Sequence, residues 1–100
     1  MELNGSFERW LRMVVINALD DAIDLSGNFT YQDIDNSNLV TCILDGLLEA
    51  AKKKRQWVFT IFDENLEPHY DESMVERLLN TDHKKLSFII RSACISKVVA

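Results

Sequence analysis

A helical apolar pattern near the start of the chain constrains the fold more than any other sequence feature. From Phe7 to Ile23, apolar residues recur at steps of three and four, which places them on one broad face of a helix. Ser6 is a suitable N-cap, and Ser26-Gly27-Asn28 can end the segment because glycine tolerates the left-handed conformation of helix ends. The pattern predicts a helix over residues 7–24 with one buried side.

A second segment with the same periodicity covers residues 38–54, with Ser37 as its predicted cap. Gly46 lies within its apolar stripe, where glycine costs about 1 kcal/mol relative to alanine. A close crossing of two helices would explain this small residue. The run Lys52–Arg55 follows, at the helix end where cations are favourable.

Two further helices are predicted in the last third of the chain. The first is capped by Asp71 or Ser73 and runs through Asn80. The second covers residues 82–98 and is capped by Thr81.

The segment between the second and third predicted helices favours extended structure. Trp57–Phe62 is aromatic and β-branched, which predicts a buried strand. Asp63-Glu64-Asn65 turns the chain, and Leu66–Tyr70 can return as a short second strand. Such a hairpin must pack on the helices, pair with Phe29–Tyr31, or pair with another subunit, because an isolated hairpin is only marginally stable.

These segments predict one mostly α-helical domain over residues 1–100, with four helices and one short strand or β-hairpin between helices 2 and 3. The chain has only three glycines and one proline in 100 residues, which favours helices. An apolar fraction of 47% is typical of a globular chain with one modest core. The predicted core consists of Trp10, Leu11, Val14, Leu19, Ile43, Leu47, Val58, Ile61, Leu78, Leu86, Ile89 and Ile90.

The net charge of -5 argues against a dedicated nucleic-acid binder, because phosphate contacts need clustered Lys and Arg. It would suit a basic protein partner instead. Lys52–Arg55 is interpreted as a solvated helix end rather than a phosphate site, and Trp10 and Trp57 as core residues rather than stacking platforms. No apolar run reaches 18 residues, so we expect no membrane segment and a cytoplasmic location.

Few residues are candidates for catalysis or metal binding. Cys42 and Cys94 lie on apolar helical stripes, which indicates small buried hydrophobes that stay reduced rather than nucleophiles. His69 and His83 lack a partner at helical spacing, so we interpret them as surface or cap residues. The common phosphate-binding, zinc-protease and hydrolase motifs are absent from the sequence. We therefore predict no catalytic residue, no cofactor and no metal.

Carboxylates concentrate near the end of the first helix and in the loop after it. The alternation in Asp33, Asp35 and Ser37 resembles a calcium loop, but Asn38 replaces the required glycine and Leu44 the closing glutamate. Acid–base catalysis by carboxylates stays open, although nothing selects a pair. The acidic surface is the best candidate for contact with a partner: Asp20, Asp21, Asp24, Asp33 and Asp35.

The segment 58–98 resembles the C-terminal part of tail assembly chaperones of long-tailed phages. The resemblance rests on an apolar run, an acidic turn, a proline and an aromatic, then two helices with small and apolar residues. The family's turn usually contains a glycine, whereas Leu66 follows Asn65 here. The matching positions are Phe62-Asp63-Glu64-Asn65, Pro68, Tyr70, Glu72, Val75, Leu78, Leu86, Ile89, Ala93 and Ser96.

This resemblance implies a non-enzymatic helical protein that holds a tape-measure or tail-tube protein before assembly. We accordingly predict a protein-binding role, with a partner that is basic or has exposed apolar segments. The alternative is a small acidic inhibitor or immunity protein that blocks a nuclease or a nucleic-acid-binding complex. A small enzyme subunit that uses its carboxylates is a third possibility, and a homodimer is compatible with each.

Overall fold

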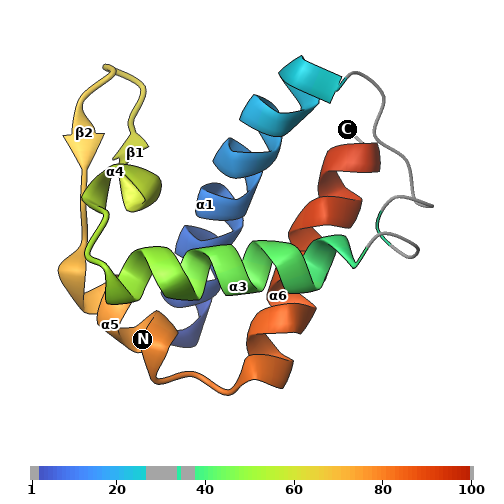
Figure 1. Ribbon diagram of the computed structural model, residues 1–100. Coiled ribbons are helices and arrows are strands. Elements are labelled where there is room, and N and C mark those ends of the chain that lie inside the picture. The colour runs from blue at the N-terminus through green and yellow to red at the C-terminus, as the bar shows by residue number, and fades with distance from the viewer. Residues whose placement is uncertain (1–2, 27–33, 35–37, 100) are drawn as a thin grey trace.

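The computed structural model describes residues 3–26, 34 and 38–99. Within these residues the chain is mostly α-helical with one short β-hairpin, as predicted (Figure 1). The elements in chain order are α1 (Leu3–Ser26), α3 (Leu39–Lys52), α4 (Gln56–Phe59), β1 (Ile61–Phe62), β2 (Pro68–His69), α5 (Glu72–Leu79) and α6 (His83–Val99).

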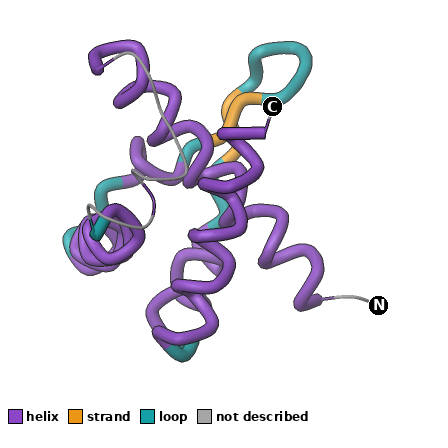
Figure 2. The backbone as a smooth tube through the Cα atoms, turned by 90° about the vertical axis from the view of Figure 1, so that its right-hand side faces the viewer, coloured by secondary structure: helices purple, strands orange, loops and turns teal. Residues whose placement is uncertain are grey.

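The two long helices α1 and α6 pack along one another, and α3 crosses in front of them (Figure 1). Apolar side chains from all three helices meet between them, together with Phe59, Val75 and Leu78. At the edge of this interface, the Arg12 guanidinium donates to the Ser92 hydroxyl. The hairpin projects beyond the packed helices in both views (Figures 1 and 2).

Most of the predicted core is confirmed. Nine of the twelve predicted residues are buried, while Ile43, Val58 and Ile61 are only partly buried and pack against the core. The prediction missed several residues that are equally buried. They are Phe7, Val15, Ile34, Leu44, Leu48, Ala50, Ala51, Phe59, Val75 and Ala93.

Helix α1 begins at Leu3 and ends at Ser26, so it is longer at both ends than the predicted range 7–24. Helix α3 begins at Leu39, after Asn38, whose φ of 55° is left-handed and whose side chain makes no capping hydrogen bond. The predicted cap Ser37 and the terminator Gly27 lie outside the described residues.

The basic run forms a well-defined end for α3. The Arg55 N–H donates to the Ala50 carbonyl at 3.0 Å, and the Lys54 N–H donates to the Ala51 carbonyl at 3.2 Å. These two bonds are those of a Schellman motif, in which the residue after the cap is left-handed. Lys54 occupies that position with a φ of 55°. The prediction that Lys52–Arg55 closes the helix is therefore confirmed, and the turn directs the chain into α4.

Asp71, one of the two residues predicted as a cap, is the N-cap of α5. Its carboxylate accepts from the Ser73 N–H at 3.0 Å and from the Met74 N–H at 3.3 Å. Hydrogen bonds, first from the Ser73 hydroxyl, hold the pKa of Asp71 below its usual value. Such bonds favour the charged form at the positive end of a helix.

The prediction that Thr81 caps the last helix is wrong. Its hydroxyl instead donates to the Arg77 carbonyl at 2.6 Å, at the end of α5. The residue before α6 is Asp82, whose carbonyl accepts from the Leu86 N–H at 3.0 Å. Thr81 thus serves the exposed carbonyls of the preceding helix, which also need partners.

The predicted strand over Trp57–Phe62 is also largely wrong. Residues 56–59 form the helical turn α4, and of the predicted strand residues Ile61 and Phe62 form β1. Phe59 is fully buried and its ring stacks on Trp10 with centroids 5.8 Å apart. Phe7 extends the stack, with its ring centroid 5.9 Å from that of Trp10. The local preference is for extended structure, and we attribute the helical turn to this tertiary contact, which fixes α4 on α1.

Strands β1 and β2 pair with each other as an antiparallel hairpin, as predicted, and the possible further partner Phe29–Tyr31 lies outside the described residues. Ile61 lies opposite His69, and Phe62 lies opposite Pro68. Asp63 organises the turn, because its carboxylate accepts from the Asn65 N–H at 2.8 Å and the Glu67 N–H at 3.0 Å.

Candidate interaction groove

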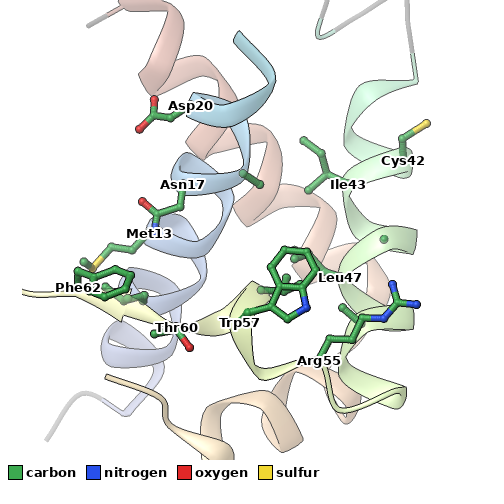
Figure 3. Close-up of a pocket in the computed structure, with 15 residues that line it drawn as sticks. Met13, Asn17, Asp20, Cys42, Ile43, Leu47, Arg55, Trp57, Thr60 and Phe62 are labelled. Atoms are coloured by element: carbon green, nitrogen blue, oxygen red, sulfur yellow. The ribbon is translucent and has the colours of Figure 1, made fainter. Parts of the chain in front are cut away.

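An open groove separates α1 from α3 (Figure 3). Both helices pack on other elements, α1 on α6 and α3 on α6 and α5, and they have little direct contact with each other. Helix α4 joins them at one end because it contacts both. The groove therefore arises because α1 and α3 both pack on α6 and do not pack on each other.

The groove has a volume of about 720 Å³. Met13, Asn17 and Asp20 project from α1 on one side, and Ile43 and Leu47 from α3 on the other (Figure 3). The remaining lining residues are Ala18, Cys42, Gly46, Ala50, Arg55, Trp57, Val58, Thr60, Ile61 and Phe62. Most of these side chains are apolar, as in sites that bind apolar segments.

Trp57 is the most unexpected residue of the groove. The sequence placed it in the core, but 76% of its surface is exposed, and Phe62 is 59% exposed. In the close-up, Trp57 lies between the two helices, while Phe62 lies beside Met13 (Figure 3). Exposed large aromatics that gather at one groove are typical of protein-binding sites, where they act as anchors.

Gly46 faces the groove rather than a neighbouring helix. A Cβ atom built on it would meet no atom within 4 Å. The explanation from a close helix crossing is therefore wrong. Because glycine has no side chain, α3 leaves additional open space in the groove at this position.

The two cysteines have opposite surroundings. Cys94 is fully buried, as predicted, and burial raises the pKa of its thiol despite the opposing charge of Arg91. Cys42 is exposed on the groove, which contradicts the predicted buried position. Its position just after the first turn of α3 lets it face solvent. Cys42 consequently offers a natural attachment point for a probe.

Of the five predicted acidic contact residues, Asp20 is the one whose side chain the structure describes. Asp20 lines the groove, but its carboxylate forms an ion pair with Lys97 of α6. Asp21 and Asp24 lie on the last turns of α1, and their side chains lie outside the described part of the chain. Asp33 and Asp35 lie outside the described residues.

Carboxylates do collect on a second hollow, which shares Met13, Ile61 and Phe62 with the groove. Its other lining residues are Trp10, Asp63, His69, Tyr70, Asp71, Glu72, Ser73 and Met74. Residues 63–76 contain six carboxylates and no Lys or Arg. This acidic stretch could have been found in the sequence, since the charge run is visible there.

Asp63 and His69 form a pair across the hairpin, with Nε2 of His69 2.8 Å from Oδ2 of Asp63. This hydrogen bond and those from Glu67 and Asn65 hold the pKa of Asp63 below its usual value. The pair stabilises the turn. In the part of the chain that the structure describes, no three His, Cys, Asp or Glu side chains are grouped to hold a metal ion.

A third, smaller hollow lies elsewhere on the molecule, around Ile34, Lys84, Phe88 and Arg91. Phe88 is 75% exposed, almost the same as Trp57, but it is not part of the groove. It is therefore a matched control for substitutions at Trp57.

No family model matches the chain, and no curated protein or solved structure matches it either. Across residues 3–26, 34 and 38–99, no helix is long and apolar enough to cross a membrane.

Proposed function

We propose that this protein is a non-enzymatic binding module that holds an apolar segment of another protein in the groove between α1 and α3. The observation that carries the proposal is the convergence of Trp57, Phe62 and Met13, all exposed and all apolar, on one open groove. Because Trp57 is largely exposed in the free protein, a partner that covers it can bury a large apolar surface on binding.

The groove suits a helical segment of the partner. An amphipathic helix can lay its apolar face into a groove between two helices, with anchors spaced by about one turn. The walls here come from two helices that are already formed, α1 and α3, so little backbone ordering would be needed on binding.

Within this class we favour a tail assembly chaperone of a long-tailed phage, on the resemblance of residues 58–98. Such a protein would hold a tape-measure or tail-tube protein until assembly. The hairpin, α5 and α6 carry the resembling positions, and Asp63 of the acidic turn organises the hairpin through its carboxylate. Deletion is expected to abolish virions but not DNA replication, and the chain should co-purify with a tail protein.

The acidic stretch over residues 63–76 favours a second candidate, an inhibitor or immunity protein that blocks a basic nuclease or a nucleic-acid-binding complex. Electrostatic attraction would then speed association, and the association rate should fall steeply with salt. Reversal of Glu64, Glu67 and Glu72 should slow association more than reversal of Asp20, Asp21 and Asp24. Equal effects would remove residues 63–76 from this model.

The groove itself is tested by affinity capture from the cells in which the protein is made. Trp57→Ser should reduce the captured partner at least tenfold, since truncation of a central aromatic anchor commonly costs about 2 kcal/mol or more. Phe88→Ser, which removes an equally exposed aromatic outside the groove, should leave capture unchanged. Circular dichroism should show both variants folded. Equal capture by wild type and Trp57→Ser would contradict the groove as the binding site.

A further inference from the structure

Residues 52–67 run from the end of α3 through α4 to the turn of the hairpin (Figure 1), and most of them are exposed, although Phe59 is buried. We call their exposed surface the contact face. Its charged groups lie at opposite ends. Lys52, Lys54 and Arg55 are exposed at one end, and Glu64 and Glu67 are exposed at the other.

Apolar side chains occupy the middle of the contact face and its tip. Trp57 and Phe62 are largely exposed, and Leu66 is 79% exposed on the hairpin turn. Helix α4 lies between the basic end of α3 and the turn of the hairpin (Figure 1). The order along the face is therefore basic, apolar and acidic.

We propose that the contact face binds a second copy of this chain in a two-fold symmetric dimer. A two-fold axis through the apolar middle would bring the basic end of each copy onto the acidic end of the other. Both charge contacts would then be attractive, and the apolar residues would cover one another. A partner of one uniform charge would instead be repelled by one end of the face.

The contact face supplies most, but not all, of the residues that a stable interface needs. A stable interface buries about 800 Å² on each partner, from about 20 residues. The contact face contributes residues 52–67, and Met13 beside Phe62 extends it onto α1. The depletion of charge at its centre and the presence of two exposed aromatics are typical of interface cores.

Reversing each end of the face tests the proposal directly. In the first variant, Lys52→Glu and Lys54→Glu make both ends acidic; in the second, Glu64→Lys and Glu67→Lys make both ends basic. Asp63 is left in place because its carboxylate holds the turn. Lys53 is also left, since it forms an ion pair with Glu49 within α3.

Light scattering coupled to size exclusion gives the readout. Wild type should have twice the 11.5 kDa mass of the chain. Each variant alone should be monomeric, with a dissociation constant at least tenfold higher. An equimolar mixture of the two variants should restore the dimer, because both contacts between unlike variants are attractive. Added salt should weaken the wild-type dimer.

The controls match the change in net charge. Lys84→Glu with Lys85→Glu changes the charge by the same amount, at exposed positions of α6 outside the face. These substitutions should leave the dimer intact, whereas Trp57→Ser should dissociate it and Phe88→Ser should not. A wild-type chain that stays monomeric up to millimolar concentration would overturn the proposal. So would a dimer that the charge reversals do not affect.

This inference goes beyond the proposed function, and the two fail separately. A second copy and a partner segment would compete for Trp57, so the monomeric charge variants should capture the partner at least as well as wild type. A chain that captures a partner through Trp57 but never dimerises overturns the dimer alone. A dimer that captures no partner overturns the groove function alone.

Discussion

The two tryptophans of this chain have the same side chain and opposite surroundings. Trp10 is 9% exposed and is stacked between Phe7 and Phe59. The stack continues to Arg77, whose guanidinium carbon lies 5.0 Å from the ring centroid of Phe7. Trp57 is only two residues from Phe59 in sequence, yet most of its surface is in solvent.

The helical turn of α4 explains this difference. Successive helical residues are about 100° apart, so residues 57 and 59 point in nearly opposite directions, whereas a strand would place both on one face. Phe59 takes the inward direction because it completes the stack on Trp10. Trp57 is therefore turned outward, onto the groove. The buried ring of Phe59 thus stabilises the fold, and its position leaves the ring of Trp57 exposed on the groove.

The largest expected effect compares Trp10→Ala with Trp57→Ala. Removal of the buried ring should lower the free energy of unfolding by about 3–5 kcal/mol, through lost burial and a cavity. Removal of the exposed ring should change it by less than about 0.5 kcal/mol. Urea unfolding followed by circular dichroism measures both. A comparable loss for the two variants would show that Trp57 is not turned outward.

The hairpin turn carries a smaller effect. Leu66 has a φ of 62°, a left-handed conformation that is strained for a leucine. Leu66→Gly should relieve the strain and raise the free energy of unfolding by about 0.5–1 kcal/mol, after the entropy that glycine adds to the unfolded chain.

Glu67→Gly is the matched control for Leu66→Gly. It is the next residue, and its φ is not left-handed, so glycine there should reduce stability instead. Urea midpoints of the three proteins compare them. A destabilised Leu66→Gly variant would mean that the exposed leucine has a contact that outweighs its strain.

Gly46→Ala, on the α3 side of the groove, should separate an effect on stability from an effect on binding. Alanine should stabilise α3 by about 0.5–1 kcal/mol, because glycine is unfavourable in helices and the added methyl group meets no atom. The same methyl group should reduce partner capture by narrowing the groove. Asp45→Ala, at an exposed neighbouring position that does not line the groove, should leave capture unchanged. A destabilised Gly46→Ala chain would contradict the open space at this position.

The smallest expected effect is the loss of the stabilising contribution of Asp63 to the hairpin at low pH. The pKa of Asp63 is lowered in the folded chain, first by the hydrogen bond to His69. Its contribution is therefore fully present above the ordinary value of 3.8 and is lost as the pH falls through the lower folded value. The amide signals of Asn65 and Glu67, which donate to this carboxylate, should report the loss by nuclear magnetic resonance.

Asp63→Asn should abolish this acid transition, because the side chain no longer titrates. Glu64→Gln changes a neighbouring carboxylate that is exposed on the same turn and should leave the transition in place. A transition that survives in Asp63→Asn would assign it to another group.

The periodicity of apolar residues was enough to find the long helices and most of their buried face. Trp10, Leu11 and Val14 follow a spacing of one helical turn, and they are buried in α1 as that spacing predicts. The sequence does not decide which residue caps α5, because Asp71 and Ser73 are equally good capping residues. Only hydrogen-bond geometry distinguishes them, and Thr81 shows that a capping residue can serve the preceding helix instead.

The groove could not be predicted from the sequence, because it depends on which surfaces of α1, α3 and α6 pack against one another. Gly46, Cys42 and Trp57 each lie in a local pattern that favours burial, and each faces the groove. Local spacing determines which residues share a side of a helix. Whether that side is covered depends on packing between distant segments, and here α1 and α3 both pack on α6 and leave the space between them open.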